Sequence, residues 1–115
     1  MKILKPEYEH SDSRRKLTQL ITDDIKQVNV YHANRGAVLG NHYHKRTVEY
    51  FVITKGTFIV TIDTANGRVK FPANKGISFV VFPNERHSLR VLSPTAAMLT
   101  FLTRAYSPKS PDIFK

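Results

Sequence analysis

A His-x-His pair and a nearby glutamate have the types and spacing of a metal site. His42 and His44 are one residue apart, so on a β-strand both imidazoles project from the same face. Two neighbouring imidazoles in a core cannot both be charged at low cost, whereas neutral imidazole is a good ligand for first-row transition metals. Glu49 would share the core-facing side of the next strand with Phe51 and Ile53, and a carboxylate there is costly unless it is paired or bound to a cation.

A third imidazole, that of His87, comes from a separate hairpin. The apolar run 79–82 predicts a buried strand, a turn follows it, and His87 opens the next strand. Taken alone, His10 and His32 are typical of surface or hydrogen-bonded histidines. The other three of the five histidines, together with Glu49, favour a metal site. The chain has no cysteine, so a metal must be held by His, Asp, Glu or backbone oxygen.

The elements that must position these residues are predicted to be β-strands. Apolar residues alternate with polar ones, or β-branched and aromatic residues gather, in four runs at 27–32, 47–53, 57–62 and 79–82. Asn66-Gly67 predicts a tight hairpin turn with positive φ, and further turns are predicted at 72–76, 83–84 and 93–94. This spacing is typical of an all-β sandwich or small barrel, and it does not choose among a jelly roll, an OB-fold and a lipocalin-like barrel.

Two segments depart from the strand pattern. Residues 13–22 are the best helical candidate, with a short apolar stripe formed by Leu17, Leu20 and Ile21. Residues 106–115 contain two prolines and few apolar side chains, and we expect them to form an extended C-terminal tail. The 115 residues, of which 41% are apolar, have the size and composition of one domain, residues 1–115.

The charge balance bears on the partners of the chain. Eighteen Lys and Arg against nine Asp and Glu give a net charge of +9, which suggests nucleic acid, an acidic membrane or a phosphorylated small molecule as a partner. The basic residues are dispersed, and the one basic run, 14–16, has no interleaved aromatic residue, so nucleic acid is disfavoured and a solvated basic surface is the alternative. No apolar run is long enough to span a membrane or to form a signal peptide, and a cytoplasmic location is expected.

The residues of the expected metal site also carry a family resemblance. The motif Gly-x5-His-x-His-x3-4-Glu-x6-Gly is matched at every position, by Gly36, His42, His44, Glu49 and Gly56. A second motif, Gly-x5-Pro-x-Gly-x2-His-x3-Asn, is matched in outline by Gly76, Pro83 and His87, with one extra residue before the proline and no Asn at the expected place. These are the two motifs of the cupin superfamily, which the chain resembles over about residues 36–56 and 76–91.

The resemblance implies an all-β cupin jelly-roll barrel, or double-stranded β-helix, with a metal in its mouth. The ligands of the family carry over as His42, His44, Glu49 and His87. Such a site takes one divalent transition metal (Zn, Mn, Ni, Fe or Cu), and the ligand set does not choose among them.

A narrower resemblance concerns enzymes of deoxysugars. Residues 40–45 and 49–51, and the tail from Ser107 to Asp112, are similar to the C-terminal cupin domain of capsular polysaccharide synthesis reductases, a metal-dependent epimerase of a 4-keto nucleotide sugar. The chain is less similar to the nucleotide-sugar 3,4-ketoisomerases. Those have Gln where this chain has Glu49, Arg-Gly where it has Gly40-Asn41, and no metal site, so the departures favour metal binding here.

The resemblance implies an isomerase or epimerase of a keto deoxysugar, with nucleotide-linked sugars as the leading substrates. The metal would act as a Lewis acid on the carbonyl during proton removal from the neighbouring carbon, and a neutral His or a Tyr would move the proton. Between Tyr31 and His32 on a neighbouring strand, His32 is the expected catalytic residue, with a plain surface role as its alternative. The alternative functions are an iron-dependent dioxygenase and a non-catalytic sugar- or ligand-binding cupin.

A homodimer is also expected. If Glu49, Phe51 and Ile53 face inward, then Tyr50 and Val52 face outward, together with Val48, which is one residue before Glu49. An apolar outer face on a strand suits a subunit interface better than it suits solvent, and cupins are commonly dimers.

Overall fold

The computed structural model describes residues 1–115 and contains eleven β-strands and no helix. The strands are β1 (Lys2–Ile3), β2 (Tyr8–Ser11), β3 (Lys16–Gln19), β4 (Gln27–Asn34), β5 (Val38–His42), β6 (Glu49–Lys55), β7 (Thr57–Thr64), β8 (Gly67–Asn74), β9 (Ser78–Val81), β10 (Arg86–Val91) and β11 (Thr95–Leu102). The all-β prediction is therefore confirmed, and no helix able to cross a membrane is present.

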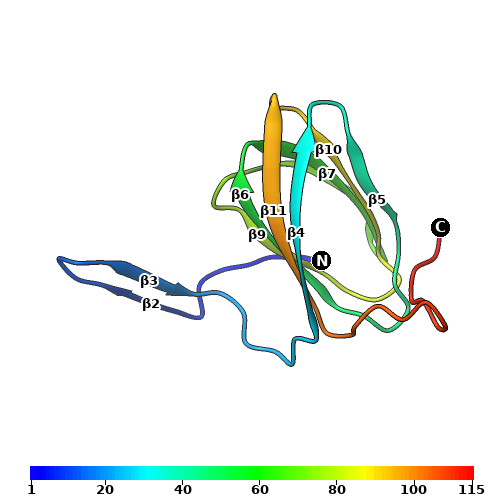
Figure 1. Cartoon of the computed structure of the whole chain (residues 1–115), viewed down its shortest axis with the longest axis horizontal. Helices are drawn as coiled ribbons and strands as arrows, with labels where there is room; N and C mark the ends of the chain where they lie inside the picture. The colour runs from blue at the N-terminus through cyan, green and yellow to red at the C-terminus, as the bar shows by residue number, and fades with distance from the viewer.

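Two antiparallel sheets form the body of the molecule. One has the strand order β1-β9-β6-β11-β4, and the other has the order β5-β10-β7-β8. They face each other as the two walls of a jelly-roll barrel, with β4 and β11 in the near wall and β5 beside the C-terminus (Figure 1). Neighbours such as β6 and β11 lie far apart in the sequence, so the pairing that closes the walls is mostly non-local.

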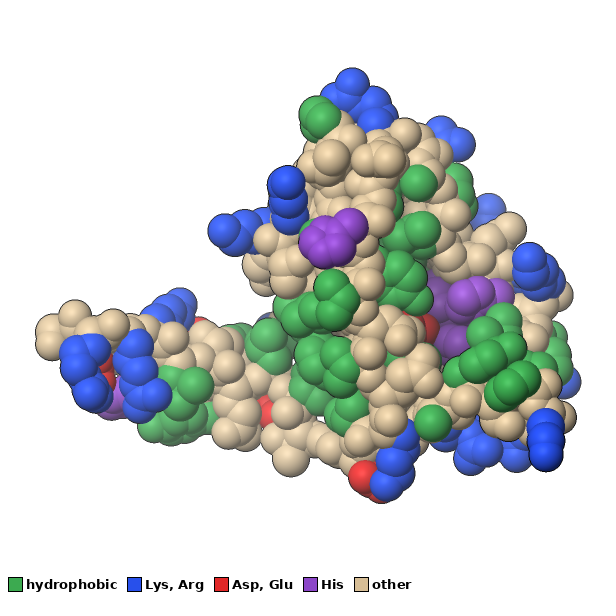
Figure 2. All heavy atoms as spheres, viewed as in Figure 1, with side chains coloured by type: hydrophobic (Ala, Val, Ile, Leu, Met, Phe, Trp, Pro, Cys, Tyr) green, Lys and Arg blue, Asp and Glu red, His purple; other side chains and the backbone are tan.

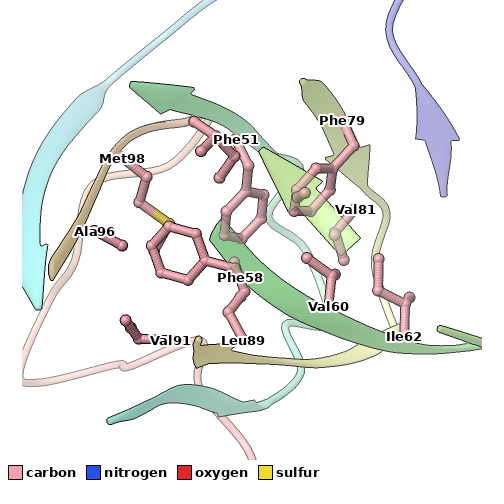
Figure 3. Packing of buried hydrophobic residues seen from close by; sticks show 12 residues of the cluster. Phe51, Phe58, Val60, Ile62, Phe79, Val81, Leu89, Val91, Ala96 and Met98 are labelled. Carbon is pink, nitrogen blue, oxygen red and sulfur yellow. The ribbon is translucent and has the colours of Figure 1, made fainter. Parts of the chain in front are cut away.

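The core fills the space between the two sheets (Figure 3). Along β6 and β7, buried residues alternate with half-buried ones, because successive side chains of a strand point to opposite faces. Phe51 stacks on Phe79 with ring centroids 4.7 Å apart, and Phe58 is fully buried. Burying one such side chain contributes about 1.5–3 kcal/mol, so the core holds the two walls of the barrel in place.

Tight turns join the strands where the sequence predicts them. The hairpin between β7 and β8 turns through Ala65 and Asn66, and Gly67 has φ +117°. Gly56, between β6 and β7, has φ +72°, and a Cβ there would lie 2.5 Å from the carbonyl oxygen of Thr95, so this position needs glycine. The turn expected at 72–76 begins later, because β8 continues to Asn74.

The helix predicted at residues 13–22 is wrong. Residues 16–19 instead form β3, which pairs with β2 in a two-stranded hairpin. Every residue of the two strands is exposed, and the hairpin projects away from the barrel (Figure 1). The apolar stripe that suggested a helix is too short to decide between the two structures, and pairing with 8–11 provides the hydrogen bonds of a strand.

Candidate metal centre

The four candidate ligands come from three parts of the barrel and meet at one place. His42 ends β5, His44 follows two residues later, Glu49 begins β6 and His87 lies in β10. Their possible ligand atoms all lie within 4.8 Å of one another. Strand β10 is paired with β5 so that His87 lies opposite His42, with ring centroids 4.8 Å apart. The structure thus brings together the four residues that the sequence singles out.

A local irregularity in β5 aims His42 into this cluster. Gly40 and Asn41 both have positive φ, +79° and +59°, and the pairing of β5 with β10 shifts register between His87 and Ser88. A Cβ on Gly40 would lie 3.0 Å from the backbone oxygen of His87. The glycine therefore allows the two strands to approach closely at the point where their histidines face each other.

Glu49 lies at the centre of the cluster. Its Oε1 is 3.0 Å from Nε2 of His44 and 3.5 Å from Nε2 of His87. The other ring nitrogen of each histidine faces a backbone carbonyl: Nδ1 of His44 donates to the oxygen of Asp112 at 2.6 Å, and Nδ1 of His87 to that of Glu85 at 3.0 Å. A carbonyl can only accept, so both rings carry hydrogen on Nδ1 and direct Nε2 to the centre, as histidine ligands commonly do.

The charges in the cluster are strongly coupled. Burial opposes ionisation of Glu49, but hydrogen bonds from His44 and His87 outweigh it and lower the pKa of Glu49 to about 2. Burial lowers the pKa of His44, yet its bonds to Glu49 and Asp112 prevail and raise that pKa. Burial and the two neighbouring imidazoles lower the pKa of His42 to about 4. The cluster thus holds an ionised carboxylate beside a neutral imidazole at neutral pH.

A small cavity opens beside the four residues. Its volume is about 30 Å³, and His42, Glu49, His87, Tyr31 and Met98 are among the side chains that line it. Figure 2 shows histidine side chains gathered in a hollow at the right of the molecule, next to an acidic side chain and a group of hydrophobic ones. His42 is the only half-buried member of the cluster, whereas the other three are buried, so His42 marks the side from which the cluster is reached.

The structure does not bring His32 to this site. Strand β4 alternates half-buried and exposed residues, and His32 is exposed on its outer face. Its neighbour Tyr31 points inward and lines the cavity. Burial and the negative charge of Glu49 raise the pKa of Tyr31, which keeps the phenol protonated. Tyr31 therefore occupies the place that the sequence analysis expected for His32.

Sequence reasoning also missed Asp112. The tail was expected to be extended, but Phe114 pairs with Tyr43 in an isolated antiparallel bridge, and Asp112 bonds to His44 and to the turn after it. No periodic pattern could have revealed a contact between residues 68 positions apart. Two basic side chains lie over aromatic rings at this end of the barrel: Nζ of Lys45 is 4.2 Å from the centroid of the Phe114 ring, and the guanidinium carbon of Arg86 is 5.4 Å from that of Tyr43.

The donor set fits a divalent transition metal. Three imidazole nitrogens and one carboxylate oxygen converge, and the carboxylate is buried at a position that would be costly for an unpaired charge. Binding of the ion would replace the proton on Nε2 of His44. The same four residues would hold the metal, and the cavity side of His42 leaves room for a further small ligand.

Comparisons with known proteins agree with the fold. The family model described as a cupin domain matches residues 29–103. Among solved structures, the 3,4-ketoisomerase from Helicobacter canadensis has a TM-score of 0.81 at 19% identity, covering 98% of this chain and 88% of that one. QdtA, a sugar 3,4-ketoisomerase from Thermoanaerobacterium thermosaccharolyticum crystallised with TDP, has a TM-score of 0.80 at 16% identity, with coverage of 98% and 85%.

The capsular polysaccharide assembling protein CapF from Staphylococcus aureus is also similar. Its TM-score is 0.73 at 19% identity, and the match covers 93% of this chain and 33% of CapF, so the chain spans about a third of that protein. At such identities the likeness shows the fold alone. No curated protein matches this sequence significantly.

Proposed function

This chain belongs to the cupin family, and on that premise we propose that it is a metal-binding isomerase or epimerase of a keto deoxysugar. The observation that carries the proposal is the convergence of His42, His44, Glu49 and His87 within 4.8 Å, beside a cavity that Tyr31 also lines. A divalent transition metal on these residues would supply a Lewis acid for a sugar carbonyl.

Tyr31 is the residue we propose for proton transfer. Its phenol is on the cavity side of β4 and stays protonated because of burial and the charge of Glu49. A protonated phenol next to a bound keto sugar can donate its proton to the carbonyl oxygen while water takes the proton of the neighbouring carbon, and the phenolate then regains a proton from water. A positioned group of this kind contributes about 10²–10⁴-fold in rate.

Nucleotide-linked keto sugars are the proposed substrates. The similar structures include sugar 3,4-ketoisomerases, a 4-keto-6-deoxy sugar epimerase and a complex with TDP-4-keto-6-deoxyglucose. The cavity of about 30 Å³ has room for roughly one water molecule. A sugar ring is much larger, so the substrate would lie at the open side of the cavity, beside the half-buried His42.

Hydrogen exchange at the substrate tests this function. TDP-4-keto-6-deoxyglucose is incubated in D₂O with metal-loaded protein, and deuterium entering next to the keto group is followed by NMR. We expect exchange with the wild type, a loss of about 10²-fold or more in Tyr31→Phe, and no change in the matched variant His32→Ala.

The outcomes separate the competing functions. Exchange that persists in Tyr31→Phe but fails in His32→Ala would overturn the assignment of the proton-transfer residue. Absence of exchange with this and related keto sugars would overturn the isomerase proposal, and oxygen uptake by the iron-loaded protein in its place would identify a dioxygenase.

We also propose that the protein is a homodimer. On the outer face of the larger sheet, Val28 and Val30 of β4 are 52% and 64% exposed, and they pair with Phe101 and Leu99 of β11. Leu99 pairs in turn with Val52 of β6, so an apolar row crosses three neighbouring strands through Val30, Leu99 and Val52. Exposed apolar rows of this kind mark an interaction surface.

The projecting hairpin supports a second copy as the occupant of this surface. Tyr8 and Leu17 lie on one face of the hairpin and are 52% and 40% exposed, whereas Glu9 and Lys16 form an ion pair on its other face. An isolated two-stranded hairpin is marginally stable in water. Each chain thus carries two exposed apolar side chains on its hairpin and an uncovered apolar sheet face, and two copies can cover both reciprocally.

A further inference from the structure

The C-terminal tail crosses the outside of the candidate metal centre. After β11 the chain returns to the end of β5, where Tyr43 and Phe114 exchange two backbone hydrogen bonds of 2.9 and 3.0 Å. Their rings stack with centroids 5.6 Å apart, and Nζ of Lys45 lies 4.2 Å from the centroid of the Phe114 ring. These contacts fix the last residues of the tail over the segment that carries His44.

Asp112 uses both its backbone and its side chain in this position. Its carbonyl oxygen accepts from Nδ1 of His44 at 2.6 Å. One carboxylate oxygen accepts from the backbone N–H of Lys45, and the other accepts from the N–H of Arg46 and the hydroxyl of Thr47, at 2.7–2.9 Å. These three donors form the turn between His44 and Glu49, so a single residue holds both the ring of one ligand and the segment that leads to the next.

We propose that Asp112 is a positioning residue of the metal centre, which keeps hydrogen on Nδ1 of His44 and so directs its Nε2 toward Glu49. The ring alone can carry its hydrogen on either nitrogen, and only one of the two tautomers leaves Nε2 free for a metal. The inference rests on the proposed metal site, but its first readout does not need a metal.

Two measurements on the full chain test the inference. In alkaline buffer, ¹H–¹⁵N NMR of the histidine rings reports which nitrogen of His44 carries hydrogen in the metal-free protein. Competition with a chelator gives the zinc affinity. Asp112→Ala keeps the backbone carbonyl but removes the three hydrogen bonds that hold it over His44, so we expect the His44 tautomers to mix and zinc binding to weaken about 10–100-fold. The matched control Asp63→Ala, which removes an exposed carboxylate paired with Arg68, should change neither. If Asp112→Ala does not fold, Thr47→Val removes one donor to the same carboxylate and should shift both readouts in the same direction.

Two results would overturn the positioning role of Asp112, and a third would overturn the proposed metal-dependent function. An Asp112→Ala variant with an unchanged His44 tautomer and unchanged zinc affinity overturns the inference. Weaker zinc binding with an unchanged tautomer also overturns it, because a merely structural role of the tail would give that result. A wild type that binds no zinc or other transition metal overturns the proposed function instead, and the tautomer measurement then still decides the role of Asp112.

Discussion

Glu49 is the residue on which the chemistry of the site depends most. It is 5% exposed, and in the absence of a cation only the imidazoles of His44 and His87 stabilise its charge. A carboxylate in this position is costly unless it is paired or coordinated. The position of Glu49 therefore couples the metal affinity of the site to the charge of His44.

Replacing this carboxylate by an amide separates the role of Glu49 as a metal ligand from its role as the charged partner of His44. In Glu49→Gln the charged partner that raises the pKa of His44 is lost, and only Asp112 still opposes the effect of burial, so we expect the pKa of His44 to fall. Zinc affinity should fall by about 10-fold or more, because the amide oxygen is a weaker ligand than a carboxylate. NMR titration of the ring and chelator competition measure the two effects.

Glu7→Gln, at an exposed glutamate, is the control for this change. A pKa of His44 that is the same in Glu49→Gln as in the wild type would contradict the pairing described above.

The sequence predicts the four candidate ligand positions of the site but not the residue of β4 that lines its cavity. The four ligand positions follow from the period of a strand and from motif spacing. From the sequence, His32 rather than Tyr31 is expected at the site, although strand alternation puts His32 on the same face as Val28 and Val30. The structure turns that face outward. Alternation fixes which residues share a face but does not say which face points to the core. The usual assignment of the more apolar face to the core is wrong for β4, because its outer face is also apolar.

Among the elements, the N-terminal arm consists of the β2–β3 hairpin and the segment that leads from it to β4. A hydrogen-bonded polar pair ties this segment to the barrel. The hydroxyl of Tyr50 in β6 donates to Oδ2 of Asp23 at 2.6 Å, on the segment between β3 and β4. A groove of about 470 Å³, lined by Leu20, Ile21 and Val80 among others, lies under the same segment. The hydrogen bond between Tyr50 and Asp23 therefore ties this segment to β6 at the edge of the groove.

This pair gives a pH dependence with a definite sign. Burial, then the hydrogen bond and charge of Asp23, raise the pKa of Tyr50 from 10.0 to about 12. The folded state thus favours the neutral phenol, and its contribution to stability is fully present below the unfolded pKa and is lost as the pH rises through the folded one. Tyr50→Phe should lower the free energy of unfolding by about 1 kcal/mol near neutral pH, and the difference should disappear toward pH 12.

Urea unfolding and the ultraviolet absorbance of ionised tyrosine measure the two quantities. Tyr106→Phe, at a tyrosine that is 57% exposed, is the matched control. A difference in stability between Tyr50→Phe and the wild type that does not change from pH 8 to pH 12 would show that the pair does not act through this hydrogen bond.

The strands were easier to predict from sequence than the arm and the tail. Strands β4, β6, β7 and β9 follow from alternation and from β-branched runs, and Gly67 marks the hairpin between β7 and β8. The 13–22 segment has too few apolar residues for periodicity to distinguish a helix from a strand. The tail is held by contacts to β5 and the turn that follows it, and such long-range contacts leave no local pattern in the sequence.

The whole molecule is elongated because the β2–β3 hairpin projects from the barrel. The molecule measures 47 × 33 × 30 Å, and the projecting hairpin extends along the longest direction (Figure 1). Its apolar face and the outer face of β4 and β11 are both uncovered in the single chain. A chain with two such surfaces gains stability by burying them, at about 25 cal/mol for each Å² of apolar area.

A charge placed on the sheet face tests the proposed dimer. We expect the wild type to behave in light scattering as two chains of 13.2 kDa, and Val28→Lys to behave as one, because a buried unpaired lysine is costly at an interface. Val38→Lys is the matched control, since Val38 is also 52% exposed but belongs to β5 in the other sheet. A wild type that is monomeric at all concentrations, or a Val28→Lys variant that remains dimeric, would contradict this interface.

The metal content of the purified, tag-free protein shows whether His42, His44, Glu49 and His87 form a metal site. Elemental analysis by mass spectrometry is compared for the wild type, His42→Ala/His44→Ala and His10→Ala/His32→Ala, which removes the same number of histidines from exposed positions. We expect about one transition-metal ion per chain in the wild type and in the second double variant, and none in the first. A wild type that takes up no metal after reconstitution, or a metal retained without His42 and His44, would contradict this assignment.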